Sequence, residues 1–215
     1  MGDNNKLDIT STVLEKGLDS VKEFLQKLIG PTVDEIGLVL SENVRLWRLK
    51  NQVRILSKAE SYLKSKNINP KKISLKVLLP LLDGASLEEE EELSDKWASL
   101  LINYVDPKQN LKSTIFPYLL NQISTLEAMC LEYIDTKWLN RYESIKSEFN
   151  ISEAELSNLI RLGLIKEVPD LTLDMDNAFE IFEEGPRDRR VLIDSNPNYI
   201  TTELGKLFLK ACKVE

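Results

Sequence analysis

Apolar side chains recur every three or four residues along most of this chain, which is the spacing of helices that bury one face. The longest such segment runs from Thr32 to Ser65, preceded by Pro31 and free of further proline. Proline suits the first helical turn because its missing N–H group has no partner there. Asn67 follows the segment, and asparagine accepts the left-handed conformation that ends many helices. The pattern predicts one helix of about 50 Å, since each residue adds about 1.5 Å.

Two apolar stripes follow the long segment and lie on nearly opposite sides of a helix, at about 100° per residue. The stripes consist of Val33, Ile36, Leu40, Val44 and Trp47, and of Leu46, Leu49, Val53, Leu56 and Leu63. A helix with opposed stripes must contact different neighbours along its length. We therefore expect the segment to be the buried central helix of a bundle.

Shorter amphipathic segments surround this helix. We expect helices over residues 11–29, before Gly30-Pro31, and over residues 73–82, ended by Asp83-Gly84. Sequences that begin with serine and have glutamate three residues later, at Ser86, Ser124 and Ser152, predict capping boxes at further helix starts. The expected buried faces of the first two helices are Leu93, Trp97, Leu100, Leu101 and Tyr104, and Leu126, Met129, Cys130, Tyr133 and Ile134.

The pattern changes near Asn140. A short helix over residues 142–149 is followed by one that ends at Leu162-Gly163, an extended start at Leu164-Ile165, and a returning strand over residues 190–193. A closing amphipathic helix carries Leu204, Leu207, Phe208 and Cys212. This is the order of a winged-helix domain. The predicted fold is mainly α: a helical bundle around one long helix (residues 1–139), then a small winged-helix-like α+β module (residues 140–215).

Composition excludes several kinds of site. The chain contains no histidine, the commonest general base and metal ligand. Cys130 and Cys212 lack C-x-x-C spacing, so they predict buried thiols of a cytosolic protein rather than a zinc site. We expect no catalytic residue, metal or cofactor. The N-terminus lacks the apolar core of a signal peptide, and no apolar stretch is long enough to span a membrane, so we expect a cytoplasmic protein.

Charge is distributed unevenly in a chain of net charge −7. Ten lysines and arginines occur between Arg45 and Lys76, against one acid, Glu60. Among them Lys50, Arg54 and Lys58, four residues apart, form one ridge of a helix, called here the basic ridge. The ridge could bind phosphates, pair with acidic surface of this chain or of a partner, or be solvated.

The winged-helix-like module has the opposite balance. Between Phe149 and Ile200 there are eleven acids and five bases, and the expected recognition helix carries Arg161 as its one cation. Duplex binding depends on cations that neutralise phosphates, so the module is better suited to protein contact than to DNA. The exception is the cluster of Arg187, Arg189 and Arg190 at the wing.

Several motifs, taken in order, resemble the abortive-infection alpha family. They are residues 30–31 and 35–37 (Gly-Pro and Glu-Ile-Gly), 46–51 (LWRLKN), 77–82 (VLLPLL), 84–86 with the acidic run after them, 95–103 (DKWASLLIN), 126–128 and 202–205. The resemblance covers about residues 30–212. It implies a role in bacterial defence against phage, in which the infected cell stops growing or dies before phage matures. It supplies no molecular mechanism and no catalytic residues.

Polar and aromatic members of these motifs form the candidate site. They are Trp47, Arg48, Asn51, Asp95, Trp97 and Asn103, on helices that we expect to pack together. Buried polar groups need partners, so the set predicts either an interhelical hydrogen-bond network or a ligand or partner site.

The expected function is that of a non-enzymatic anti-phage protein that acts by binding a protein of the host or the phage. The alternative is a nucleic-acid-binding regulator that uses the basic ridge and the wing arginines. The sequence leaves the oligomeric state open.

Overall fold

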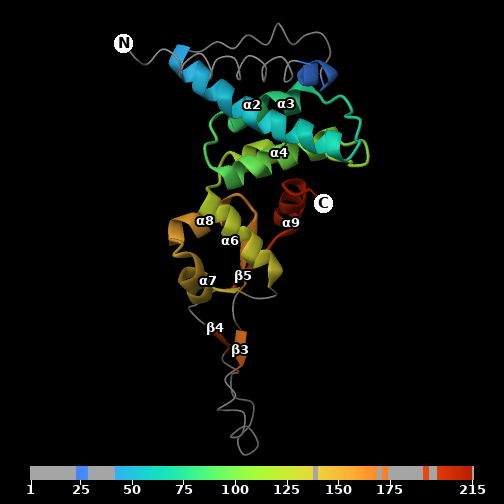
Figure 1. The fold of residues 1–215 in the computed structure, drawn as a ribbon. Helices are drawn as coiled ribbons and strands as arrows, with labels where there is room; N and C mark the ends of the chain where they lie inside the picture. Colours follow the sequence, from blue (N-terminus) through green and yellow to red (C-terminus); the bar gives the residue numbers. More distant parts are fainter. Residues whose placement is uncertain are drawn as a thin grey trace, which may run out of the picture. The chain divides into compact units, whose positions relative to one another are not determined.

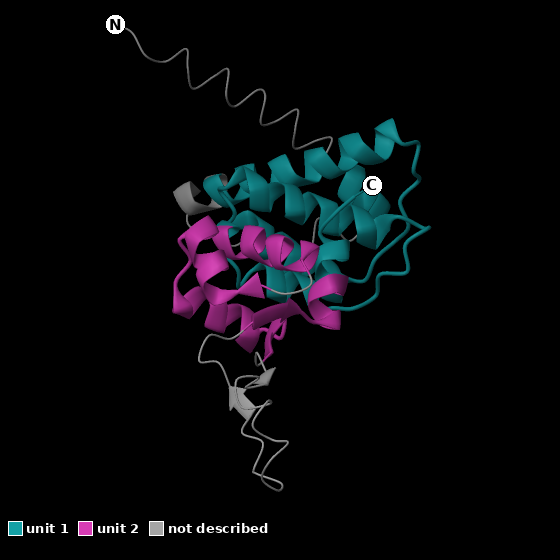
Figure 2. Cartoon of the chain, turned by 90° about the horizontal axis from the view of Figure 1, so that it is seen from below, with its two compact units in different colours: residues 1–125, 208–215 teal, residues 126–207 magenta. Residues whose placement is uncertain are grey.

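The computed structural model describes residues 23–28, 42–137, 140–168, 171–173, 191–193 and 198–214 (Figure 1). The chain groups into two compact units, coloured in Figure 2. The first contains residues 1–125 and 208–215, and the second contains residues 126–207. The expected division into domains 1–139 and 140–215 stays a prediction.

The first unit is a helical bundle. Its helices are α2 (Glu42–Ser65), α3 (Leu75–Ser86), α4 (Glu91–Val105) and α5 (Phe116–Leu120), with a helical segment at residues 23–28 and the end of α9 (Glu203–Ala211). Helix α2 packs against both α3 and α4. The side-chain contacts described below show that α2 is antiparallel to α3 and parallel to α4. The C-terminal ends of α2 and α4 and the N-terminal end of α3 therefore lie at the same end of this unit.

Helix α2 ends where the sequence predicts. Asn67 is left-handed, with φ of 52°. The N–H group of Ile68 donates to the carbonyl of Leu63 (2.8 Å), and that of Asn67 donates to the carbonyl of Lys64 (3.1 Å). These two bonds form a Schellman motif and satisfy carbonyls that the helix leaves open. The predicted start at Thr32 and most of the preceding helix over residues 11–29 lie outside the described residues.

The buried face of α2 differs in part from the predicted stripe. Leu56 and Leu63 are buried as expected, but the face is completed by Ile55 and Ala59. Leu49 and Val53 are only half-buried. The side chains of Val33, Ile36, Leu40, Val44 and Leu46 in the predicted stripes lie outside the described residues.

Helix α3 is longer than predicted because Gly84 does not end it. The helix continues through Asp83-Gly84 to Ser86. A Cβ atom on Gly84 would lie 2.4 Å from the Trp97 ring of α4, so the glycine allows close packing rather than a turn. Trp97 is 1% exposed and lies in the core with the other predicted α4 residues, Leu93, Leu100, Leu101 and Tyr104.

One of the three predicted capping boxes is confirmed in full. The N–H group of Ser152 donates to Glu155 Oε2 (2.7 Å), and the N–H group of Glu155 donates to Ser152 Oγ (3.4 Å). The box at Ser86 is wrong, because Ser86 is the last residue of α3 and α4 begins at Glu91. Helix α6 begins at Thr125, directly after Ser124.

The second unit combines helices with a small sheet. Its elements are α6 (Thr125–Thr136, which it shares with the first unit at Thr125), β1 (Asn140–Arg141), α7 (Tyr142–Phe149), α8 (Glu153–Arg161), β2 (Ile165–Val168), β3 (Leu171–Leu173), β4 (Val191–Ile193), β5 (Asn198–Thr201) and the start of α9. Strands β1, β5 and β2 form an antiparallel sheet in that order, and β3 pairs with β4. The predicted returning strand is β4. The strand that completes the sheet, β5, directly precedes the predicted last helix.

Two glycines are required beside this sheet, one for a turn and one for close packing. Gly163 has φ of 70° and ends α8, as the sequence predicts. Gly205 in α9 approaches the residue before β2 so closely that a Cβ atom would lie 2.1 Å from the carbonyl oxygen of Leu164. The hydroxyl of Thr202 accepts from the Gly205 N–H group (3.0 Å), which caps the start of α9.

The buried face of α6 also differs from its prediction. Cys130 and Ile134 are fully buried, but Met129 is 47% exposed, and Leu131 takes its place in the core.

The described residues are mainly helical with a small antiparallel sheet, as predicted. No described helix has the length and apolar character needed to cross a membrane.

Candidate interaction site

Polar side chains of α2 bind the C-terminal end of α3. Arg48 donates from Nε to Ser86 Oγ (2.7 Å) and from Nη2 to Asp83 Oδ1 (2.5 Å). Asn51 Nδ2 donates to the Ser86 carbonyl (3.1 Å), and Gln52 Nε2 donates to the Leu82 carbonyl (3.0 Å). Carbonyls at the end of a helix lack intrahelical partners and carry partial negative charge. These donors therefore satisfy the end of α3 and fix its register against α2.

The next turns of α2 bind the start of α4. Arg54 donates from Nη2 to the carbonyl of Glu88 (2.7 Å) and from Nη1 to that of Glu89 (3.4 Å). Lys58 Nζ donates to Asp95 Oδ1 (2.6 Å) and to a carboxylate oxygen of Glu91. Two of the three residues in the basic ridge are thus paired inside the chain.

The environment of Lys58 keeps its amine charged. Burial lowers the pKa of Lys58, but hydrogen bonds and charge from Asp95 and Glu91 outweigh burial and raise it above its ordinary value of 10.5. An amine with a raised pKa is protonated at neutral pH and is a poor general base. Lys58 therefore serves as a cationic hydrogen-bond donor.

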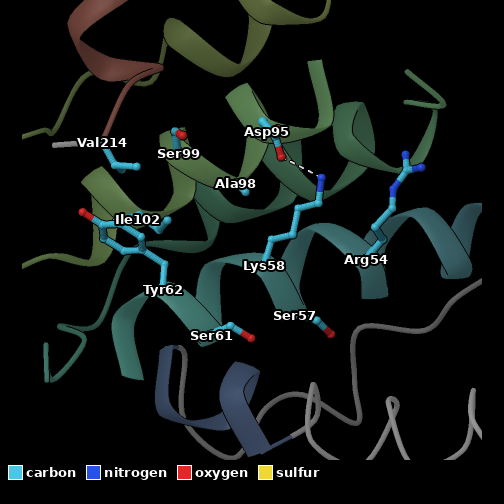
Figure 3. Close-up of a pocket in the computed structure, with 10 residues that line it drawn as sticks. All are labelled: Arg54, Ser57, Lys58, Ser61, Tyr62, Asp95, Ala98, Ser99, Ile102 and Val214. Carbon is cyan, nitrogen blue, oxygen red and sulfur yellow. Dashed lines mark hydrogen bonds and ion pairs between the residues drawn. The ribbon is translucent and has the colours of Figure 1, made fainter. Parts of the chain in front are cut away.

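An open groove of about 770 Å³ follows this pair between α2 and α4 (Figure 3). Figure 3 shows Lys58 and Asp95 pointing toward one another from the two helices. Apolar lining comes from Ala98, Ile102 and Val214. Hydroxyl groups line it as well, on Ser57, Ser61, Tyr62 and Ser99. We call this the α2–α4 groove.

Asn103 holds the C-terminal end of α9 in the first unit. Its Nδ2 donates to the carbonyls of Ala211 and Lys213, each at 2.8 Å, and its side chain is buried. Helix ends need such donors. Asn103 thus fixes the segment that carries Val214, one wall of the α2–α4 groove.

The structure divides the candidate site residues among separate places. Arg48 and Asn51 form the interhelical network that the sequence suggests, and Trp47 Nε1 donates to Glu89 Oε1 (2.8 Å). Asp95 lies instead in the groove, and Trp97 packs on Gly84. Asn103, as described above, binds α9. Whether any of them contacts a partner stays a prediction.

The basic residues also have different surroundings. Lys50 is exposed, while Arg54 and Lys58 are half-buried and paired. Arg187, Arg189 and Arg190 lie outside the described residues. Lys58 therefore pairs with carboxylates of this chain, whereas Arg54 binds backbone carbonyls. Whether the ridge binds phosphates or a partner stays a prediction.

Sequence reasoning did not identify the acceptors of these bonds. The sequence predicts a cap at Ser86 and a helix end at Asp83, and Glu89 and Glu91 appear only as part of an acidic run. The signal was present, because a basic helix and an acidic run both stand out in the sequence. Their pairing depends on α2 and α4 being parallel, which sequence spacing does not give.

The described residues contain no group of three or more acidic, histidine or cysteine side chains placed to hold a metal ion. Both cysteines are buried and unpaired by disulfide. Burial, together with the charges of Glu127 and Glu155, raises the pKa of Cys130 to about 12. A thiol with so high a pKa is a poor nucleophile.

The comparison with protein families, given below, agrees with the resemblance seen in the motifs. No curated protein and no solved structure matches the chain. A family model described as abortive infection alpha matches residues 41–212, which includes α2 to α9 nearly in full. The chain therefore belongs to the abortive infection alpha family.

Proposed function

We propose that this protein acts in abortive infection, as a non-enzymatic cytoplasmic protein that binds a protein of the host or the phage. Family membership supports the defence role. The α2–α4 groove supports the binding role, and it is the observation on which the proposal depends.

The groove has the features of a site for a peptide segment. Ala98, Ile102 and Val214 offer apolar surface for an anchoring side chain, and the serine and tyrosine hydroxyls beside them can hydrogen-bond to a peptide backbone. The Lys58–Asp95 pair at its side offers both a cation and an anion. Lys58 is protonated, and the pKa of the Cys130 thiol, which does not line the groove, is raised. Neither group therefore supports covalent or acid–base chemistry.

We propose further that the second unit is a winged-helix module used for protein contact. The order α7, α8, β2, β3–β4 ladder, β5 and the sheet order β1-β5-β2 support this assignment. The exposed face of α8 carries Glu153, Ala154, Ser157 and Arg161. The Arg161 guanidinium is bound to Asn158 Oδ1, at 2.7 Å from Nη2. A face with this charge is poorly suited to neutralise phosphates.

Filling the groove tests the proposal. Ser61 is exposed and Ser99 half-buried, so Ser61→Arg and Ser99→Arg place long side chains in the groove without removing a core contact. Ser144→Arg, at an exposed position of α7, is the matched control. Tagged wild-type and variant proteins are captured from phage-challenged cells, and phage plating is measured in parallel.

We expect the wild type and the control to recover one common protein and to reduce plating. Both groove variants should lose the two properties together while keeping the wild-type circular dichroism spectrum. Recovery of no protein by the wild type, or full protection by the filled variants, would contradict the proposal.

A further inference from the structure

Lysines gather at one end of the first unit, and all but Lys71 are exposed. The connection after α2 and the loop after α4 lie side by side there, because the Lys71 N–H group donates to the carbonyl of Val105 (2.7 Å) (Figure 1). Lys71 Nζ also donates to the Gln109 carbonyl (2.5 Å). The two segments and the first turn of α3 carry the lysine end, which we define as Lys66, Lys71, Lys72, Lys76, Lys108 and Lys112.

Few carboxylates occur in the segments that carry the lysine end. From residue 61 to residue 80 the sequence contains no acid, and from residue 106 to residue 115 it contains Asp106 alone. Asp106 is buried, and its carboxylate accepts from the Lys108 N–H group. This contrasts with the basic ridge, whose Arg54 and Lys58 bind the start of α4. A cluster of cations in a chain of net charge −7 creates a local positive field.

Stability of the fold does not explain these positions. Lysines near a helix C-terminus stabilise the helix dipole, which accounts for Lys66 just beyond α2. Lys72 and Lys76 instead flank the start of α3, where the dipole is positive and the first turn has no acid. A cation in the first turn, such as Lys76, gains no favourable interaction with the dipole. Their placement indicates an anionic partner.

Exposed leucines distinguish between classes of anionic partner. Leu75 and Leu79 are 41% and 44% exposed and lie four residues apart on one face of α3, beside Lys76. Apolar side chains flanked by lysines suit an anionic lipid surface, where leucines enter the headgroup region and the amines meet phosphates. Nucleic-acid sites favour arginine forks and stacked aromatic rings. Residues 61–80 and 106–115 contain no arginine, and the Lys66 amine lies 5.5 Å from the centre of the Tyr62 ring beside the lysine end.

We infer that the lysine end, together with Leu75 and Leu79, is a peripheral binding surface for anionic lipid bilayers. The leucines insert at the headgroup level and the lysines supply the electrostatic attraction. Both contributions are needed, because a single weak anchor gives only reversible binding. This surface adjoins the α2–α4 groove, because the Lys66 amine lies 5.5 Å from the centre of the Tyr62 ring, but none of its lysines or leucines lines the groove. The inference does not depend on the protein partner proposed above.

The test is flotation of the full chain with vesicles of phosphatidylcholine, with or without phosphatidylglycerol. The charge variant is Lys72→Glu, Lys76→Glu and Lys108→Glu. The matched control, Lys50→Glu, Lys146→Glu and Lys166→Glu, makes the same change in net charge at exposed positions elsewhere. The apolar variant is Leu75→Ser with Leu79→Ser. Circular dichroism and urea unfolding verify that each variant is folded.

We expect the wild type and control to float only with anionic vesicles, less so as salt rises. The charge variant should bind about a hundredfold more weakly, given the attraction of each lysine to an anionic leaflet. The apolar variant should also bind more weakly. An RNA or DNA oligonucleotide, measured by fluorescence anisotropy at the same salt, should not compete for the protein.

Three results would overturn the inference: no flotation of the wild type, equal loss in the control and charge variants, or oligonucleotide binding that the charge variant loses and the apolar variant keeps. The last result would assign the lysine end to nucleic acid. Groove-filled variants that still float would show that the lipid surface and the proposed protein site are separate.

Discussion

Oδ1 of Asp95 on α4 lies 2.6 Å from Nζ of Lys58 on α2, and the pair faces the α2–α4 groove. Lys58 belongs to a ridge whose spacing suits a run of phosphates, yet its amine is held by two carboxylates of its own chain. The lysine end carries another group of cations of the first unit, farther along the chain. Pairing with carboxylates of this chain thus distinguishes Lys58 from the proposed lipid surface.

The Lys58–Asp95 pair should contribute modestly to stability. A double-mutant cycle with Lys58→Met and Asp95→Asn, measured by urea unfolding at neutral pH, should give a coupling of about 0.5–1 kcal/mol, as for other partly exposed pairs. The pKa of Lys58 is raised on folding, so this contribution is complete below pH 10.5 and is lost as pH rises through the folded-state pKa. A coupling that grows above pH 10.5 would contradict this account.

Adding one methyl group at Gly84 should destabilise the first unit. A Cβ atom there would lie 2.4 Å and 2.7 Å from two carbons of the Trp97 ring, which has no room to move in the core. Gly84→Ala should therefore cost about 1–3 kcal/mol despite the better helix propensity of alanine. Urea unfolding followed by tryptophan fluorescence measures the change. A stabilised Gly84→Ala protein would show that the Trp97 contact is not tight.

The same change at Gly205 should be worse, because its obstacle is backbone. The new Cβ atom would lie 2.1 Å from the carbonyl oxygen of Leu164, so α9 and the start of β2 would have to separate. We expect a loss of more than about 3 kcal/mol, larger than that at Gly84. Gly163→Asn is the control, since asparagine tolerates the φ of 70° there and the nearest atom is 3.7 Å away. Its unfolding midpoint should fall only slightly.

Replacing Asn103 should release the C-terminal segment. Asn103→Ala leaves the carbonyls of Ala211 and Lys213 without their donor and should cost about 1–3 kcal/mol. Asn103→Asp should cost more, because a carboxylate would face those carbonyl oxygens. Hydrogen exchange should rise first in residues 208–214. Uniform exchange across the first unit instead would mean that Asn103 supports the whole bundle.

The Cys130 thiol should be inert in the folded protein. It is fully buried, and its pKa is raised to about 12. Iodoacetamide at pH 8 should modify Cys130 only as fast as the protein unfolds, whereas urea-unfolded protein should react at once. Mass spectrometry of the Cys212→Ser protein isolates this thiol. Rapid labelling of the native protein would indicate that α6 opens readily.

Local chemistry explains which parts of the fold were predicted. The end of α2 at Asn67, the capping box of Ser152 and Glu155, and the turn at Gly163 all follow from residues within one helical turn. All five residues predicted for the buried face of α4 are buried, because its apolar spacing is strong. These features depend on steric limits and hydrogen bonds that any neighbouring structure would leave unchanged.

Predictions from local sequence were wrong where a residue far away in the chain determines what a position contacts. Gly84 was predicted to break a helix because glycine usually does, but Trp97 needs the space that a side chain would occupy. Ser86 has the spacing of a cap, but it accepts from Arg48 of α2. Met129 has the spacing of a core residue, yet it is 47% exposed.

The sequence by itself determined the helical class, most helix positions, the family, and the presence of separate basic and acidic runs. Tertiary structure alone decided which charges are paired, because Lys58 and Asp95 are 37 residues apart and meet only when α2 and α4 pack in parallel. Helix direction and packing depend on the whole core rather than on any short motif. For that reason the α2–α4 groove and the lysine end became visible only in the folded chain.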